Sequence, residues 1–297
     1  MKWRNVPMDN KTAQQIAQHA TNALLYELAL YPKPGLVDPL DNGAHHDMDV
    51  TTFIKSATAL TPYFEAFAQA GLSAEAGQTP KALFAKIRRL GVQAEKTMFV
   101  ATDGINTHKG AIFSFALFCA GTAAIAQRQG GTLAPWTATQ TKDTFTLIQA
   151  MTQELLLDFK DLETKSNLSY GETLYVKYGL KGIRGEASAG YPALQDYGLP
   201  FMRRTVDLPW QTRLLDLFLE LLGHTTDSNI IHRSDMATLK AVQQDVQNLA
   251  TQGGVQKLGV APMTAMNQTF IAKNISPGGT ADLIAGSVFF SFLEKIL

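Results

Sequence analysis

The sequence has little of three things that would place it in a special class: cysteine, net charge and uninterrupted apolar sequence. Cys119 is the only cysteine in 297 residues, which excludes an intrachain disulfide and a cysteine metal cluster and fits a reducing cytoplasm. Lys plus Arg number 26, as do Asp plus Glu, so the formal net charge is zero. We therefore expect no wholesale binding to nucleic acid or to an anionic membrane, whereas a local basic pocket for a small anion is compatible with this balance.

Long apolar runs and common catalytic motifs are also missing. No stretch reaches the roughly 20 unbroken apolar residues that a membrane span needs. Ser114 and Thr122 interrupt the best candidate, residues 111–126, which we interpret as a buried central helix. Residues 1–15 lack an apolar core of signal-peptide length, so we expect no targeting segment. The motifs GxxxxGKS/T, GxGxxG after a strand, GxSxG and HExxH are absent, which argues against the enzyme classes that use them.

What is present is mostly helical periodicity. We predict helices at about residues 12–30, 53–71, 80–100, 111–128, 144–159, 209–223, 235–252 and 281–296. Thr79-Pro80 suits a helix start, and Gly71 is interpreted as a helix stop. Residues 173–179, TLYVKYG, fit a short strand or a helical turn. Without a repeat or linker, we predict one all-α domain over residues 1–297, with functional loops at helix ends and at most a minor strand near 173–179.

The loop GINTHKG, residues 104–110, has the composition of a binding loop. Lys109 supplies fixed positive charge, and Asn106 and His108 supply hydrogen bonds, between two glycines. The apolar helix that follows would direct free N–H groups and its positive dipole end to the same place, which suits phosphate. The alternatives are a solvated Lys109 and a structural His108.

A second loop, residues 32–49, is rich in oxygen ligands. Magnesium needs one or two carboxylates plus water and substrate phosphates, so a pair such as Asp47 and Asp49 would suffice. Asp49 can instead simply cap the helix that begins near residue 50. A zinc site is less favoured, because His45 and His46 are adjacent and lack helical spacing.

Three later segments carry further chemistry. Arg184 and Glu186 lie among glycines in residues 178–192, where arginine can grip phosphate and glutamate can act as a base; a surface ion pair between them is the alternative. Ser276, Gly278 and Gly279 precede a helix whose first turn contains Asp282, so either a cation or a sugar hydroxyl should meet that acid. Asp227 and Asn229 form an oxygen-rich pair or a helix cap.

These loops together resemble the triphosphoribosyl-dephospho-coenzyme A synthase family, which builds the prosthetic-group precursor of citrate lyase and of malonate decarboxylase. The segments that carry the resemblance, in the family's order, are PKPGLVD (32–38), GAHHDMD (43–49), AEKTM (94–98), TDGINTHKGAIF (102–113), GIRGEASAGYP (182–192), DSN (227–229) and SPGGTADLIA (276–285).

The resemblance implies a helical enzyme that transfers the triphosphoribosyl part of ATP to the 2′-hydroxyl of 3′-dephospho-CoA and releases adenine. A carboxylate should act on the acceptor hydroxyl, with Asp47 as first candidate and Glu186 as second. His108 or Asn106 would donate a hydrogen bond to the departing adenine. Mg²⁺ is expected on some of Asp38, Asp47, Asp49 and Asp282. The residues expected to bind substrate are Lys33, Gly35, His45, Asn106, Lys109, Arg184, Asp227, Asn229, Ser276, Gly278 and Gly279.

Two other functions are compatible with the same loops: an N-glycosidic hydrolase of nucleotides or ADP-ribose, and a non-catalytic nucleotide-binding partner of the lyase. The sequence does not distinguish the citrate lyase pathway from the malonate decarboxylase pathway. The product would pass to the transferase that forms the holo-acyl carrier protein. The apolar last helix, residues 283–297, can pack internally or form a homodimer interface.

Overall fold

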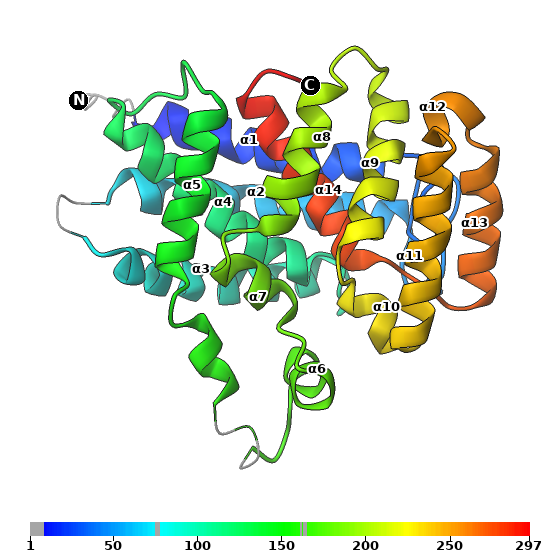
Figure 1. Cartoon of the computed structure of the whole chain (residues 1–297). Helices are drawn as coiled ribbons and strands as arrows, with labels where there is room; N and C mark the ends of the chain where they lie inside the picture. The colour runs from blue at the N-terminus through cyan, green and yellow to red at the C-terminus, as the bar shows by residue number, and fades with distance from the viewer. Residues whose placement is uncertain (1–8, 75–77, 161, 163–164) are drawn as a thin grey trace.

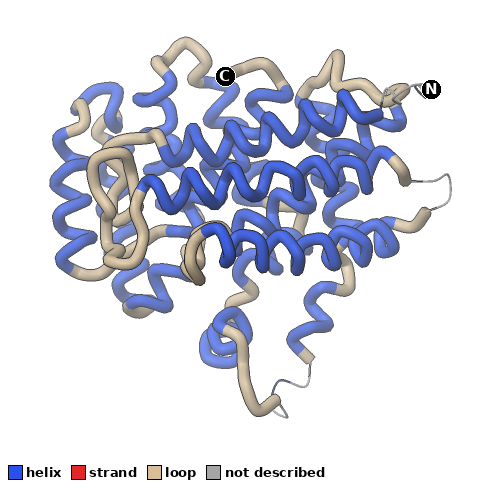
Figure 2. Tube along the Cα trace, turned by 180° about the vertical axis from the view of Figure 1, so that it is seen from behind, coloured by secondary structure: helices blue, strands red, loops and turns tan. Residues whose placement is uncertain are grey.

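The computed structural model describes residues 9–74, 78–160, 162 and 165–297, and this part of the chain contains helices and no strand (Figure 2). The first elements are α1 (Asp9–Leu28), α2 (Val50–Leu72), α3 (Pro80–Ala101), α4 (Lys109–Arg128), α5 (Ala138–Met151), the 3-10 helix η1 (Leu155–Phe159), α6 (Tyr170–Tyr178), α7 (Gly182–Ser188) and the π-helix η3 (Ala193–Gly198). The remainder are α8 (Leu199–Arg204), α9 (Trp210–His224), α10 (Ser228–Arg233), α11 (Met236–Thr251), α12 (Gly254–Leu258), α13 (Ala261–Ala272) and α14 (Gly278–Leu293). The all-α prediction is confirmed, and TLYVKYG lies largely in helix α6.

Two apolar helices, α4 and α14, form the centre of the molecule. Helices α1, α2 and α3 lie side by side across one face (Figure 2), while α5, α8 and α9 cover the opposite face and α11 to α13 close one end (Figure 1). Helix α4 is long and apolar enough to cross a membrane, yet 83% of its apolar window is buried inside the protein. It is the buried central helix that the sequence predicts, because α1, α2, α3, α5 and α14 all pack against it.

Helix α14 also packs internally. Its side chains from Leu283 to Ser291 are buried, so the internal alternative for the last apolar segment is confirmed. One continuous hydrophobic cluster joins α1 at one end of the described chain to α14 at the other. Burial of this kind supplies the main favourable free energy of folding.

The helix boundaries test the local sequence signals. Thr79 caps α3 by accepting a hydrogen bond from the Ala82 N–H, as predicted. Gly71 is not a helix stop: α2 continues to Leu72, and a Cβ at Gly71 would lie 2.2 Å from the Ala120 carbonyl oxygen of α4. Gly71 is therefore required for the close approach of α2 and α4.

The helix predicted over residues 144–159 was misplaced. Helix α5 begins at Ala138, because Thr137 and Gln140 form a capping box that the prediction overlooked, and it ends at Met151. Helices α7, α8, α10, α12 and α13 were not predicted; all but α13 are seven residues or shorter. In Figure 1, η1 and α6 extend below the rest of the molecule, where the rings of Phe159 and Tyr175 stack with centroids 4.2 Å apart.

Candidate functional site

A large pocket opens where helices α4 and α14 begin. Its volume is about 1270 Å³, which exceeds the roughly 300–1,000 Å³ of a typical single-ligand site and leaves room for two substrates. We call one part of its lining the polar end, formed by Lys33, His45, His108, Arg233, Ser276 and Asp282. The other part, the apolar arm, runs between α3, η1 and α6 and is formed by Phe84, Ile87, Val92, Leu155, Phe159 and Leu174.

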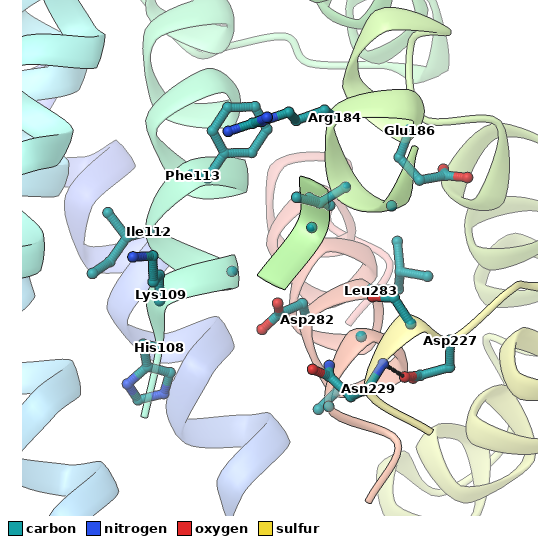
Figure 3. A pocket seen from close by; sticks show the side chains of 18 of the residues that line it. His108, Lys109, Ile112, Phe113, Arg184, Glu186, Asp227, Asn229, Asp282 and Leu283 are labelled. Atoms are coloured by element: carbon teal, nitrogen blue, oxygen red, sulfur yellow. Dashed lines mark hydrogen bonds between the residues drawn. The ribbon is translucent and has the colours of Figure 1, made fainter. Parts of the chain in front are cut away.

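The first turns of α4 and α14 lie against each other at the polar end (Figure 3). A Cβ at Gly110 of α4 would lie 2.2 Å from Oδ2 of Asp282, so glycine makes this contact possible. Because α14 begins at Gly278, Asp282 is its fifth residue and lies just beyond the first turn in which the sequence placed it. Neither helix has a side-chain cap from its N-cap residue, His108 or Pro277. The two positive helix ends therefore face the same space, which favours an anion there.

Asp282 is a carboxylate without a compensating partner among the residues that the structure describes. It makes no hydrogen bond to any residue that the structure describes, although it lies between two helix ends. Burial raises the pKa of Asp282 well above its usual range, and the nearby charges of Glu27 and Asp227 raise it further. A perturbed carboxyl group inside a pocket is a typical candidate for metal binding or proton transfer.

His108 is bound to a side chain of α2 and not to backbone carbonyls. Its Nδ1 lies 2.7 Å from Ser56 Oγ, and the edge of its ring meets Phe53 with centroids 5.0 Å apart. Burial lowers the pKa of His108 to about 3, and the positive charge of Lys33 contributes. The imidazole is therefore neutral at physiological pH, and it can act only as a hydrogen-bond donor or acceptor.

Lys33 is buried at the polar end together with a carboxylate that the sequence interpretation missed. Its Nζ lies 2.5 Å from Glu27 Oε1, and both side chains are almost fully enclosed. Burial raises the pKa of Glu27, and the charge of Lys33 opposes this shift. A lone glutamate in the apolar run LLYELAL was the available signal, because a buried acid needs a partner.

His45 and Ser276 form a second polar contact at the same end. The two side chains meet at 2.9 Å, from His45 Nε2 to Ser276 Oγ, and the guanidinium of Arg233 lies 3.4 Å from His45 Nδ1. Burial and the charge of Arg233 lower the pKa of His45 to about 4. Arg233 lines the pocket but was not selected from the sequence, although it follows the DSN segment on the short helix α10.

Asp227 caps two helices at once. One oxygen accepts hydrogen bonds from Asn229 N–H and Ile230 N–H of α10, and the other accepts from Thr280 N–H and Oγ1 of α14. The capping alternative is thus confirmed for this residue. The glycines predicted to bind phosphate make room for this arrangement, since a Cβ at Gly278 would lie 2.8 Å from the Asn229 amide and one at Gly279 would lie 3.2 Å from Asp227. Asp227, Asn229, Gly278 and Gly279 all line the pocket.

Arg184 and Glu186 both line the pocket but point in different directions (Figure 3). The guanidinium carbon of Arg184 lies 5.1 Å from the Phe159 ring centroid, and its buried Nη1 has no hydrogen-bond partner among the described residues. Glu186 accepts a hydrogen bond from Ala193 N–H, and burial raises its pKa. The surface ion pair considered as an alternative does not form, because the two side chains diverge.

Several predicted site residues lie elsewhere or have other partners. Gly35 has a φ of +71° and abuts the Ile275 carbonyl oxygen, so packing explains it. Asp38 accepts three hydrogen bonds from backbone N–H groups of its own loop. Asp49 caps α2, and hydrogen bonds from Thr51 and Thr52 lower its pKa to about 2.

Asp47 is 62% exposed, and together with Gly35, Asp38 and Asp49 it is outside the pocket lining. In the described residues no group of three or more His, Cys, Asp or Glu side chains is arranged to hold a metal. The structure thus does not bring Asp38, Asp47 and Asp49 together with Asp282, as one shared magnesium site would require.

The GINTHKG loop reaches the pocket at its rim. Asn106 Oδ1 accepts a hydrogen bond from the Lys109 N–H, and Lys109 Nζ pairs with Glu95 of α3 at 3.2 Å. Both residues line the pocket, with the Lys109 side chain 55% exposed. Lys109 is therefore available to a ligand only at the pocket entrance.

Comparison with known proteins finds a matching family model and similar proteins. A family model described as ATP:dephospho-CoA triphosphoribosyl transferase matches residues 13–297. A probable 2-(5''-triphosphoribosyl)-3'-dephosphocoenzyme-A synthase of Streptococcus pyogenes serotype M49 is 43% identical over 296 residues, covering 98% of this chain and 100% of the relative. A relative of the same name from Streptococcus equi subsp. equi is 42% identical over 295 residues, with the same coverage of both chains. No solved structure matches the chain.

Proposed function

The chain belongs to the ATP:dephospho-CoA triphosphoribosyl transferase family, and from that premise we propose how its pocket transfers the triphosphoribosyl group of ATP to the 2′-hydroxyl of 3′-dephospho-CoA with release of adenine. The observation that carries the proposal is one pocket of about 1270 Å³ with a polar end between two helix N-termini and a separate apolar arm. A reaction between two nucleotides, one of which carries a long organic chain, needs a binding region for each nucleotide, and the two regions must adjoin.

The triphosphate of ATP binds at the polar end. The N-termini of α4 and α14, whose N-cap residues supply no side-chain cap, the buried ammonium of Lys33 and the hydroxyl of Ser276 supply positive potential and donors there. Lys109 and Asn106 contact the outer phosphates from the rim of the pocket. Because the triphosphate stays on the transferred sugar, these groups hold it throughout the reaction.

Asp282 would hold Mg²⁺ against that triphosphate. A bare carboxylate beside a phosphate group would be repelled, and a divalent cation between them removes this conflict. Asp282 fits the role because it lacks a described partner and lies at the polar end. One protein carboxylate suffices when the phosphates supply the other ligands, and the cation then neutralises charge on the triphosphate.

The acceptor occupies the apolar arm. Dephospho-CoA joins a flexible pantetheine chain to adenosine through a diphosphate, so it needs an elongated apolar surface with a cation near its middle. Arg184 meets that need, since its buried Nη1 lacks a partner among the described residues and its guanidinium lies over Phe159 in the apolar arm. Arginine binds diphosphate bidentately, and the aromatic ring holds the guanidinium plane in place.

Glu186 is the proposed general base. Its raised pKa suits proton transfer, and it lies on the short helix that also carries Arg184. The acceptor 2′-oxygen forms a bond to C1′ of the ATP ribose while the C1′–N9 bond breaks, and its proton passes to the Glu186 carboxylate. Adenine leaves with the electron pair of the broken bond, and His108 donates a hydrogen bond to it.

Release of free adenine tests the proposed function. The protein is incubated with ATP, Mg²⁺ and dephospho-CoA, and adenine is measured together with the mass of the acceptor product. Adenine formed only when dephospho-CoA is present supports transfer, whereas adenine formed equally without it would indicate the hydrolase alternative. Tight ATP binding without adenine release would indicate the non-catalytic alternative.

A matched pair of variants separates the roles of the two carboxylates. Glu186→Gln should reduce the turnover number and leave nucleotide affinity intact, whereas Asp282→Asn should weaken the Mg²⁺-dependent part of ATP affinity. Arg184→Lys should raise the KM for dephospho-CoA more than that for ATP, because lysine cannot make the bidentate contact. We further propose that the reaction is cytoplasmic and that the product passes to the transferase that loads the acyl carrier protein.

A further inference from the structure

Three hydrogen-bonded side chains, which we call the relay, fix how His108 faces the pocket. Thr107 Oγ1 donates a hydrogen bond to Ser56 Oγ at 2.7 Å, and Ser56 Oγ meets His108 Nδ1, also at 2.7 Å. Ser56 lies on α2 and is fully enclosed, whereas Thr107 and His108 lie directly before α4. The relay therefore connects α2 with the loop that starts the central helix.

The hydrogen atoms of the relay have one favourable arrangement. Ser56 Oγ already accepts the hydrogen of Thr107, and its own hydrogen has one described acceptor, His108 Nδ1. If Nδ1 carried the imidazole hydrogen, Ser56 Oγ would accept two hydrogens and leave its own without an acceptor in an enclosed place. A buried donor without an acceptor is unfavourable, so Nδ1 is the acceptor.

The other ring nitrogen then carries the hydrogen and faces the pocket. His108 lines the pocket. Its Nε2 has no hydrogen-bond partner among the described residues. It is also not one of the enclosed polar atoms that lack a partner, so it keeps some accessible surface. Nε2 is thus reached from the pocket. Burial and the charge of Lys33 lower the pKa of His108 to about 3, so the ring does not take up a second proton near neutral pH.

We infer that Ser56 is a positioning residue that holds His108 in its neutral Nε2–H tautomer and thereby presents one hydrogen-bond donor to a nitrogen or oxygen acceptor on the bound nucleotide. The inference rests on the proposed function only for the identity of that acceptor. A neutral donor can stabilise electron density that develops on the departing adenine ring, whereas an unprotonated Nε2 would oppose it. Ser56 itself touches no substrate.

The tautomer is measured in the protein without substrate. The chain has six histidines, so selective ¹⁵N-histidine labelling gives a simple spectrum, and His108→Gln identifies the signals of His108. Protonated and unprotonated ring nitrogens differ strongly in ¹⁵N chemical shift. We expect His108 to show an unprotonated Nδ1 and a protonated Nε2 with no change between about pH 6 and pH 8, well above its lowered pKa. A protonated Nδ1 would overturn the inference.

Two substitutions test whether the relay determines the tautomer of His108. Ser56→Ala removes the group that donates to Nδ1, and Thr107→Val removes the hydrogen that makes Ser56 Oγ a donor toward the ring. Each should shift the His108 signals toward a mixture of tautomers, and Ser56→Ala should lower kcat about tenfold with little change in the KM for ATP. Ser56→Thr keeps the hydroxyl and should restore both the tautomer and kcat.

The matched control is Thr58→Ala, which removes an exposed hydroxyl of the same helix that bonds only to its own backbone. It should leave the His108 spectrum and kcat unchanged. Loss of kcat in Ser56→Ala with an unchanged tautomer would overturn the inference, because Ser56 would then act in another way. If the wild type has the expected tautomer but releases no adenine, the proposed function fails and the assignment of the relay stands.

Discussion

Replacing Asp282 by asparagine should stabilise the fold while removing activity. No residue in the described part of the chain donates a hydrogen bond to the ionised carboxylate, and Glu27 and Asp227 add unfavourable negative charge around it. Asparagine has the same shape without the charge. For an uncompensated charge in this environment we expect the free energy of unfolding to rise by about 1–3 kcal/mol at about pH 7.5.

The pH dependence of that gain follows from the raised pKa of Asp282. The folded state holds the Asp282 proton to higher pH than the unfolded chain, because burial raises the pKa in the folded state above its usual value. Stability is therefore lost as pH rises from about 4 through the folded pKa, by about 1.4 kcal/mol for each pH unit between the unfolded and the folded pKa. The difference in stability between Asp282→Asn and the wild type should be small near about pH 4 and should grow as pH rises toward the raised folded pKa.

Urea denaturation at about pH 4.5, 6 and 7.5 measures this difference by linear extrapolation. Asp143→Asn, which removes the same formal charge from an exposed position of α5, is the control and should change stability by less than about 0.5 kcal/mol at each pH. If Asp282→Asn destabilises the protein at the highest pH, or if its effect does not vary with pH, the carboxylate is compensated and the reasoning is refuted. Mg²⁺ with ATP should stabilise the wild type more than the variant.

Three further changes have distinct expected outcomes. Asp227→Ala removes the caps of α10 and α14 and should lower the free energy of unfolding by about 1–4 kcal/mol, measured by urea denaturation; an unchanged value would mean that water replaces both caps. Gly110→Ala places a methyl group against Asp282 and should lower both stability and ATP affinity. The control is Gly91→Ala on α3, which has nothing within 4 Å and should raise the free energy of unfolding by about 0.5–1 kcal/mol. Unchanged stability in Gly110→Ala would refute the close contact. The pH profile of kcat/KM should rise through the raised pKa of Glu186, since the base must be ionised, and Glu186→Gln should abolish that limb; persistence of the limb would assign it to another group.

Periodicity predicted most of the long helices because an amphipathic helix buries one face, whereas α4 and α14 are buried on nearly all sides and are marked by their apolar runs. The fold class, the central helix and the caps at Thr79 and Asp49 follow from apolar spacing and local hydrogen bonding, which a sequence displays directly. Gly71 was misread because the same residue type serves a helix stop and a close helix contact. Only the position of α4 distinguishes these uses.

The sequence predicted which loops form the candidate site, but it predicted the function of single residues in those loops much less well. The glycine-rich segments near residues 108, 184 and 278 do meet at one pocket. The acids of residues 38–49 resembled ligands by composition, yet Asp38 and Asp49 hold their own backbone turns. Conversely, Ser56 lies inside a helix, where nothing in the local pattern separates it from structural residues. Glu27 was marked only as a lone acid in an apolar run.

The meeting of Gly110 with Asp282 ties the pocket to the completion of folding. The two residues come from opposite halves of the chain, so the polar end exists only after the last helix has docked against the fourth. Contacts of such long sequence separation form late and slow the folding reaction. A nucleotide bound there would consequently protect the chain's two halves together against unfolding, and nucleotide binding would report on the integrity of the whole molecule.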